Sequence, residues 1–144
     1  MRGMSGAAEY KKPLPVPDLE SAQFWMGLKK HELTIQRCER CGRHIYYPRS
    51  ICPHCHAGSE DLKWVRARGR GKVYTYTIVR QAAIPSFAPD VPYVFAVVEL
   101  EEGPHMVTNI VGCKPEEVRC EMPVQIVYDD VTSEITLPKF KPVK

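Results

Sequence analysis

Two pairs of cysteines constrain this chain more than any other feature of its sequence. Each pair has the spacing Cys-x-x-Cys, and ten residues separate the two pairs, Cys38/Cys41 and Cys52/Cys55. A spacing of two residues lets both thiolates of a pair reach one metal ion, and ten residues suffice for a hairpin that brings the pairs together. Four thiolates complete a tetrahedral shell and leave no open position. The sequence therefore predicts one structural metal ion per chain, expected to be Zn²⁺, in a zinc ribbon over residues 33–60.

Three other interpretations of these cysteines compete with zinc. Four thiolates also suit iron, and the sequence leaves the choice between zinc and iron open. Residues 52–56 read Cys-Pro-His-Cys-His, which is formally a haem-attachment motif, but haem would leave the other cysteine pair without a role. Disulfides are disfavoured because the first ten residues lack the apolar run of a secretory signal, so we expect the protein in the cytoplasm, where thiols stay reduced. No run of about 18 or more apolar residues is present that would span a membrane.

Other candidate residues near and beyond the ribbon receive less specific roles. His44, His54 and His56 could each replace a cysteine ligand, but four sulfurs suffice, so we expect solvated or hydrogen-bonded side chains. Cys113 and Cys120 lie outside the ribbon. A helical turn after Cys113 would lower the pKa of its thiol, but no adjacent base is indicated, so we expect both thiols to be unreactive.

The rest of the chain is typical of a mainly β protein with an N-terminal helical arm. Residues 1–17 are rich in proline and are expected to form an extended, flexible arm. Residues 18–32 are expected to hold a helix that Asp18 caps and that runs to about Lys30. Residues 61–144 are expected to form a small OB-fold barrel. Its predicted strands cover residues 64–67, 73–79, 93–100, 105–111, 124–128 and 134–140.

Two of these strands and one basic row carry further expectations. In the strand at 73–79, alternation places Tyr74 and Tyr76 on one face, and we expect them in the barrel core rather than as stacking platforms for bases. The strand at 93–100 is apolar on both faces, which predicts a cover over the outside of the barrel. Basic residues alternate just before the first of these strands, at Arg66, Arg68, Arg70 and Lys72. We expect a solvated face there, with contact to phosphates of RNA or coenzyme A as the alternative.

The sequence shows no recognisable catalytic constellation. It contains no phosphate-cradling glycine loop, nucleophile elbow or His-Glu metal-hydrolase motif. It carries 20 basic and 17 acidic residues, and the resulting net charge of +3 is small for a nucleic-acid-binding protein. These features favour a binding or accessory protein over an enzyme.

Several short motifs, taken in order, point to a known family. They are Phe24-Trp25 in the expected helix, the two cysteine pairs, Tyr47-Pro48-Arg49 between them, Gly71–Thr77, and Thr108–Cys113. Over residues 15–128 this order resembles the acyl-CoA-associated zinc-ribbon/OB-fold family. The resemblance implies a rubredoxin-like ribbon followed by an OB-fold, but it carries over no coenzyme A site. His56 stands where knuckles of this type usually carry glycine, so the second knuckle is expected to differ in shape.

The resemblance also implies a function. We expect a non-catalytic accessory subunit that docks on a thiolase-like, hydratase or aldolase enzyme and helps to form its acyl-CoA channel; the alternative is a nucleic-acid-binding module. The arm at 11–17 and the apolar loop at 84–92 are expected to bury against the partner, with Phe87 as an anchor. The sequence leaves open the acyl group, the partner's reaction, the stoichiometry and any direct contact with coenzyme A.

Overall fold

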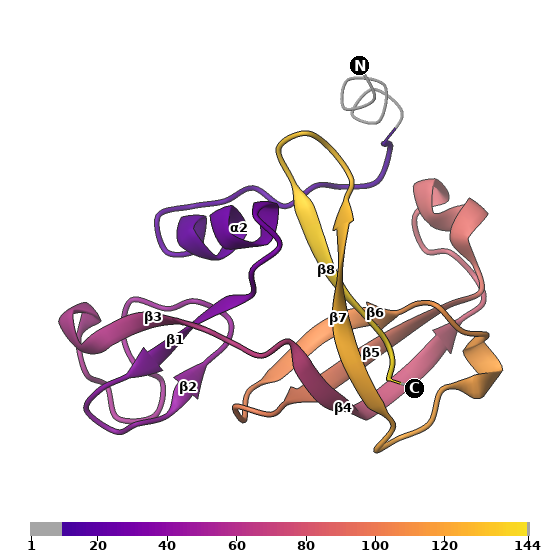
Figure 1. Cartoon of the computed structure of the whole chain (residues 1–144). Helices are drawn as coiled ribbons and strands as arrows, with labels where there is room; N and C mark the ends of the chain where they lie inside the picture. The colour runs from indigo at the N-terminus through magenta and orange to yellow at the C-terminus, as the bar shows by residue number, and fades with distance from the viewer. Residues whose placement is uncertain (1–9, 144) are drawn as a thin grey trace.

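The computed structural model describes residues 10–143, which form a short helix, a three-stranded sheet and a closed barrel (Figure 1). The helix α2 (Ala22–Lys29) is followed by the sheet strands β1 (Thr34–Cys38), β2 (His44–Ile45) and β3 (Leu62–Arg66). The barrel consists of β4 (Arg70–Val79), β5 (Tyr93–Leu100), β6 (His105–Ile110), β7 (Pro123–Asp130) and β8 (Thr136–Pro142). Residues 1–9, which belong to the predicted arm, lie outside the described residues. Within residues 10–143, no helix is long and apolar enough to cross a membrane.

The helix begins later than predicted. Oδ1 of Asp18 accepts hydrogen bonds from the backbone N–H (2.9 Å) and the hydroxyl (2.8 Å) of Ser21, which closes a turn ahead of the helix. Asp18 therefore caps this turn, and the α-helix itself starts at Ala22. The predicted end at about Lys30 is confirmed, because the last helical residue is Lys29.

The ribbon sheet has the strand order β2-β1-β3. The strand predicted at 64–67 as the start of the barrel is β3, which pairs antiparallel with β1 from Thr34–Arg66 to Cys38–Leu62. After β3, Gly69 adopts a φ of +74°, a conformation that suits glycine, and the chain turns into β4. The first strand after the cysteine pairs thus completes the ribbon, because its partner is an earlier strand rather than the next one.

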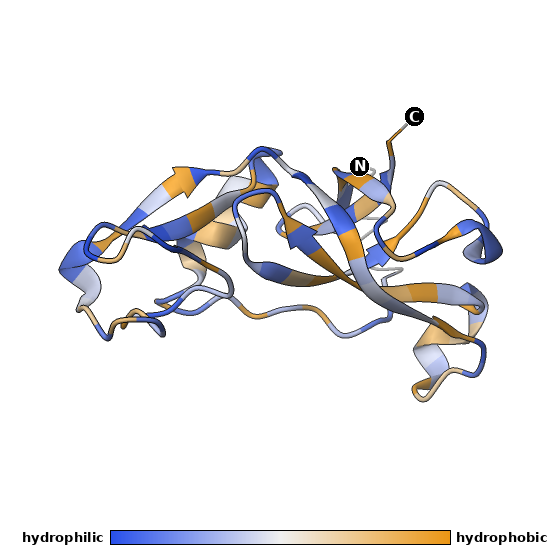
Figure 2. Ribbon diagram, turned by 90° about the horizontal axis from the view of Figure 1, so that it is seen from below, coloured by the Kyte–Doolittle hydropathy of each residue, from blue (hydrophilic) through white to orange (hydrophobic). Residues whose placement is uncertain are grey.

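The barrel has the strand order β4-β5-β6-β8-β7. It closes where β7 pairs with β4 and where Ile110 of β6 meets Phe140 of β8 in a short parallel contact. Figure 2 shows polar and apolar residues alternating along its strands, as expected when one face of each strand lines the interior. A closed five-stranded barrel after the ribbon confirms the predicted fold class, mainly β with an OB-fold.

A β-bulge in β4 places Tyr74 outside the barrel. Val73 pairs with Val98, and Thr75 pairs with the adjacent Val97, so Tyr74 has no partner on β5. The extra residue shifts the alternation by one position. Tyr76 packs against the core, whereas Tyr74 is 52% exposed. The prediction that both tyrosines belong to the core is confirmed for Tyr76 and wrong for Tyr74.

One hydrophobic core joins the barrel to the helix and to part of the ribbon sheet. Phe24 and Leu28 of α2 and Ile35 of β1 are fully buried in the same cluster as barrel residues such as Val98. A second, smaller cluster of buried residues surrounds the cysteines: Cys38, Ile45, Cys52, Ala57 and Leu62. The cysteine end of the ribbon therefore has little apolar core of its own.

The described part of the arm, residues 10–17, has no regular secondary structure, as predicted, and it contacts the loop after β4. Nζ of Lys12 forms an ion pair with Asp90 (2.5 Å) and lies 5.6 Å from the centroid of the Phe87 ring. The Phe87 ring packs against Tyr93, with centroids 6.0 Å apart. The arm and the loop thus contact each other within the chain, and Phe87 is half-buried without any partner protein.

The outer face of β5 stays open in the described chain. Val94 and Val98 point into the core and are buried, whereas Phe95 is 45% exposed and its neighbour Val107 on β6 is 54% exposed. The second apolar face of this strand, which predicted a cover, is therefore not covered by residues 10–143. An apolar surface remains on the outside of the barrel.

Candidate metal centre

The two cysteine pairs meet at one point. Sγ of Cys38 lies 3.7 Å from Sγ of Cys55, and Sγ of Cys41 lies 3.7 Å from Sγ of Cys52. All four sulfurs lie within 4.8 Å of one another. Sulfurs about 2.3 Å from a tetrahedral ion are about 3.8 Å apart, whereas a disulfide requires about 2.05 Å. The donor set and its spacing therefore fit zinc and do not fit disulfides.

The backbone makes the same turn at both pairs. The N–H of Gly42 donates to the carbonyl of Cys38 (2.7 Å), and the N–H of His56 donates to the carbonyl of Cys52 (2.9 Å). Gly42 has a φ of +80° and His56 a φ of +67°. His56 thus adopts the left-handed conformation that glycine adopts in the first knuckle. The expectation that the second knuckle differs in shape is wrong.

Hydrogen bonds within the second knuckle favour a thiolate. Burial by itself raises the pKa of the Cys52 thiol. Hydrogen bonds from the backbone N–H groups of Cys55 and His54, together with those of the neighbouring Cys41 and Cys38 thiols, outweigh burial and lower the pKa to about 7. The backbone N–H of Ala57 lowers the pKa of Cys55, yet burial and the neighbouring sulfurs raise it to about 11 overall. The raised pKa of Cys55 means that a second thiolate beside the first is electrostatically unfavourable. A bound cation offsets this repulsion, and a thiol that coordinates it is deprotonated.

A buried glutamine holds the segment that leads into the second knuckle. Nε2 of Gln36 donates to the carbonyl of Arg49 (2.8 Å), and its Oε1 accepts the N–H of Arg49 (2.7 Å). Gln36 lies in the middle of β1 and is 5% exposed. Sequence reasoning missed this positioning residue, because one glutamine in a short strand gives no sign of its partner 13 residues away.

The other cysteines and histidines lie outside the sulfur cluster. Nδ1 of His54 lies 3.2 Å from Nη1 of Arg43, so this histidine is hydrogen-bonded, as expected. Burial, and then the carboxylate of Glu117, raise the pKa of the Cys113 thiol, so the expected lowering by a helical turn is wrong. Cys120 is exposed. A raised pKa makes Cys113 a weaker nucleophile, which agrees with the prediction of an unreactive thiol.

The predicted basic row is a solvated face. All four of its side chains are exposed: Arg66, Arg68, Arg70 and Lys72. Arg68 pairs with Glu101 (3.3 Å), and Lys72 pairs with Glu121 (2.9 Å). Because carboxylates neutralise two of the four charges, the row does not form a continuous surface for phosphates.

Comparison with known proteins identifies both parts of the chain. Residues 25–61 match the domain described as "ChsH2, rubredoxin-like zinc ribbon domain". Residues 64–129 match the domain described as "ChsH2, C-terminal OB-fold domain". The two matches adjoin at the start of β3, so the OB-fold match includes most of this last strand of the ribbon sheet.

Two relatives and one solved structure extend these matches along most of the chain. A DUF35 domain-containing scaffold protein of Methanocaldococcus jannaschii is 39% identical, with 83% of this chain and 89% of the relative covered. A probable enoyl-CoA hydratase alpha subunit of Thermomonospora curvata is also 39% identical over 91% of this chain, but this chain spans only 40% of that subunit's length.

The solved structure is a chain of the Ltp2-ChsH2(DUF35) aldolase. It is 39% identical and superimposes with a TM-score of 0.78 over 90% of this chain and 98% of that chain. Similarity of this extent, in sequence and in fold, covers the ribbon and the barrel together. This chain therefore belongs to the family of DUF35 domain-containing proteins, with a ChsH2-type rubredoxin-like zinc ribbon and OB-fold.

Proposed function

We propose that this chain is a non-catalytic accessory subunit that docks on an enzyme acting on acyl-CoA thioesters and helps to form its acyl-CoA channel. The observation that carries the proposal is the match, at 39% identity, along 98% of a chain in the Ltp2-ChsH2(DUF35) aldolase. The relatives named as a scaffold protein and as a hydratase alpha subunit support the same role. The partner is accordingly an aldolase, a hydratase or a thiolase-like enzyme.

Within this function, the metal has a structural role. Cys38, Cys41, Cys52 and Cys55 are the proposed ligands of one zinc ion per chain, because their sulfurs lie within 4.8 Å of one another in a zinc-ribbon domain. Four thiolates leave no position for a substrate, so the ion contributes folding energy rather than chemistry. All six cysteines are unbridged, which suits the reducing cytoplasm in which we place the protein.

The outer face of the barrel is the proposed docking surface. Phe95 and Val107 lie on adjacent strands there and are 45% and 54% exposed, so binding would remove their apolar surface from water. The loop at 84–92 contributes Ile84, which is 46% exposed. Phe87, the anchor expected from the sequence, suits this role less well because it already packs against Tyr93.

Co-purification with an acyl-CoA enzyme encoded beside this chain tests the proposal. The parent chain is expected to hold the partner and, in isolation, to turn over no acyl-CoA thioester. Phe95→Asp is expected to weaken the complex by roughly 2 kcal/mol or more, about 30-fold in Kd, because it places a charge in an apolar contact. Ile51→Asp is the matched control, since Ile51 is 57% exposed and belongs to the ribbon, next to the second cysteine pair.

The outcomes separate the parts of the proposal. A loss of the partner by Ile51→Asp but not by Phe95→Asp would move the docking surface to the ribbon. Turnover of acyl-CoA thioesters by the isolated chain would contradict the accessory role itself. A nucleic-acid-binding role is not proposed, because the relatives are scaffold proteins and acyl-CoA enzyme subunits and the basic row is half neutralised.

A further inference from the structure

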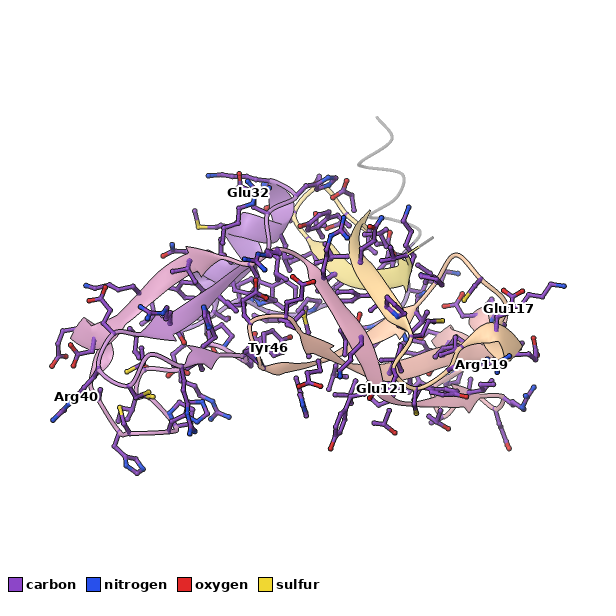
Figure 3. All side chains as sticks on the ribbon, turned by 60° about the horizontal axis from the view of Figure 1, so that its bottom comes forward. Glu32, Arg40, Tyr46, Glu117, Arg119 and Glu121 are labelled. Carbon is purple, nitrogen blue, oxygen red and sulfur yellow. The ribbon has the colours of Figure 1, made fainter. Side chains whose placement is uncertain are left out.

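A cavity of about 610 Å³ lies at the junction of the ribbon and the barrel. Its walls come from segments distant in the sequence: residues 42–46, 49 and 53–54 of the ribbon, and residues 102–105, which cover the turn after β5 and the first residue of β6. Figure 3 labels one of the lining residues, Tyr46, between the two parts of the molecule. The volume lies within the range of about 300–1,000 Å³ that is usual for small-molecule sites. We call it the junction cavity.

The junction cavity carries a surplus of positive charge and many hydrogen-bond donors. Its ionisable lining residues are Arg43, His44, Arg49, His54, Glu102 and His105. They include three of the five histidines of the chain, and two guanidinium groups face a single carboxylate. Guanidinium groups bind phosphate in a bidentate manner, and imidazoles add further donors. The chemistry of the lining therefore suits a phosphate-bearing ligand.

The ribbon fixes the basic residues in place. Arg43 directly follows the first knuckle, and its carbonyl accepts the N–H of Cys38 (2.8 Å), which fixes the backbone at Arg43. The backbone of Arg49 is held by both ends of the Gln36 amide. Within residues 10–143, no hydrogen bond or ion pair engages the guanidinium group of Arg49. Arg43 thus lies next to β2, and Arg49 lies in the loop after β2, where the two hydrogen bonds to Gln36 fix its backbone.

The barrel side of the cavity offers groups suited to a nucleoside. His105 lines the cavity, and its imidazole packs against the ring of Tyr74, with centroids 4.3 Å apart; Tyr74 lies beside the cavity and is not part of its lining. Tyr74 is 52% exposed because the bulge turns it outward. An exposed aromatic ring of this kind is a platform on which a base can stack. Oε2 of Glu102 accepts the N–H of Arg68 (2.8 Å), whereas its Oε1 is buried with no hydrogen-bond partner among residues 10–143. That oxygen can accept a ligand's hydroxyl or amino group.

We propose that the junction cavity binds the phosphorylated adenosine end of coenzyme A thioesters, with Arg43 and Arg49 on the phosphates and Tyr74 beside the base. The inference rests on the proposed function, which implies that an acyl-CoA thioester is present in the complex. Free adenine nucleotides share this chemistry. They differ from coenzyme A because they lack its 3′-phosphate and its pantetheine arm.

Titration calorimetry of the full, zinc-loaded chain with coenzyme A tests the inference. The parent is expected to bind coenzyme A more tightly than dephospho-coenzyme A or ADP, each by roughly tenfold, because each lacks a charged phosphate contact. Pantetheine, which has neither phosphate nor base, is expected not to bind measurably. Tyr74→Ala is expected to weaken binding of coenzyme A roughly fivefold or more.

A double variant isolates the two guanidinium groups. Arg43→Ala/Arg49→Ala is expected to weaken coenzyme A binding by roughly a hundredfold, about tenfold for each charge-assisted contact. The matched control is Arg80→Ala/Arg119→Ala, which removes the same charge from exposed positions outside the cavity. Figure 3 labels Arg119 on the barrel, at the end of the molecule opposite to Arg40 of the ribbon. Zinc content and circular dichroism are measured for every variant to show that the ribbon is intact.

Three results would overturn the inference: no measurable binding of coenzyme A by the parent, equal binding by the double variant and the parent, or equal binding of ADP and coenzyme A. Binding of single-stranded RNA in preference to coenzyme A would also overturn it. In each case, co-purification of the partner enzyme with the same variants remains a separate result. The proposed function can therefore stand if the junction cavity proves not to be a coenzyme A subsite.

Discussion

Replacing one cysteine of the cluster tests the metal centre directly, and Cys38→Ser is the sharpest choice. Cys38 ends β1, is fully buried, and has its Sγ 3.7 Å from that of Cys55. A hydroxyl is a far poorer zinc ligand than a thiolate. Structural zinc contributes an apparent binding free energy of about 10–16 kcal/mol, so an even share among four ligands is roughly 3 kcal/mol. We therefore expect the variant to lose about a hundredfold or more in zinc affinity.

Loss of zinc should unfold the cysteine end of the ribbon but not the barrel. The cluster around the cysteines has Ile45 and Leu62 as its only large apolar side chains, and burying each contributes about 1.5–3 kcal/mol. Ordering the segment costs about 1.5 kcal/mol for every residue, so these contacts alone do not hold it. The barrel and α2 share a separate and larger core. Amide exchange should accordingly become fast near residues 38–57 and stay slow in β5.

The assay combines elemental analysis, competition with a chelator and amide hydrogen exchange. Cys113→Ser is the matched control: it removes a half-buried thiol outside the cluster and should leave zinc content and exchange unchanged. Parental zinc affinity in Cys38→Ser would refute the ligand assignment. Slow exchange in the metal-free ribbon would refute the argument that zinc holds it together. Iron in the purified parent would show that the choice of zinc was wrong.

Two pairs of substitutions test how the surrounding fold supports this site. His56→Gly should stabilise the zinc-loaded protein by about 1 kcal/mol in urea unfolding, because His56 has a φ of +67°. Gly42→Ala in the other knuckle should destabilise the protein by a similar amount for the same reason. A destabilised His56→Gly variant would show that the His56 side chain itself has a role. Phe24→Ala should cost about 3–5 kcal/mol, because Phe24 is fully buried and its ring meets those of Trp25, Tyr46 and Tyr47 edge-on at 5.0–5.7 Å. Phe95→Ala, on the open outer face, should cost much less, and equal costs would contradict the assignment of the two faces.

Features that depend on short stretches of chain could be predicted from the sequence. The spacing of Cys38/Cys41 and Cys52/Cys55 was sufficient to predict that four sulfurs converge, because two residues between thiols fix their reach within one turn. The barrel strands could likewise be placed to within a few residues, since alternating and continuous apolar patterns follow from strand geometry. The proline-rich segment excluded a helix in the arm for an equally local reason.

Long-range packing decided the features that the sequence did not show. One extra residue in β4 turned Tyr74 outward, and alternation cannot reveal a bulge before the partner strand is known. The strand at 62–66 joined the ribbon because it found β1 as its partner, and Gln36 gained its role only when folding brought Arg49 within hydrogen-bond distance. The junction cavity is the clearest case: Arg43 and Glu102 are 59 positions apart, and only the packing of the ribbon against the barrel makes them line one space.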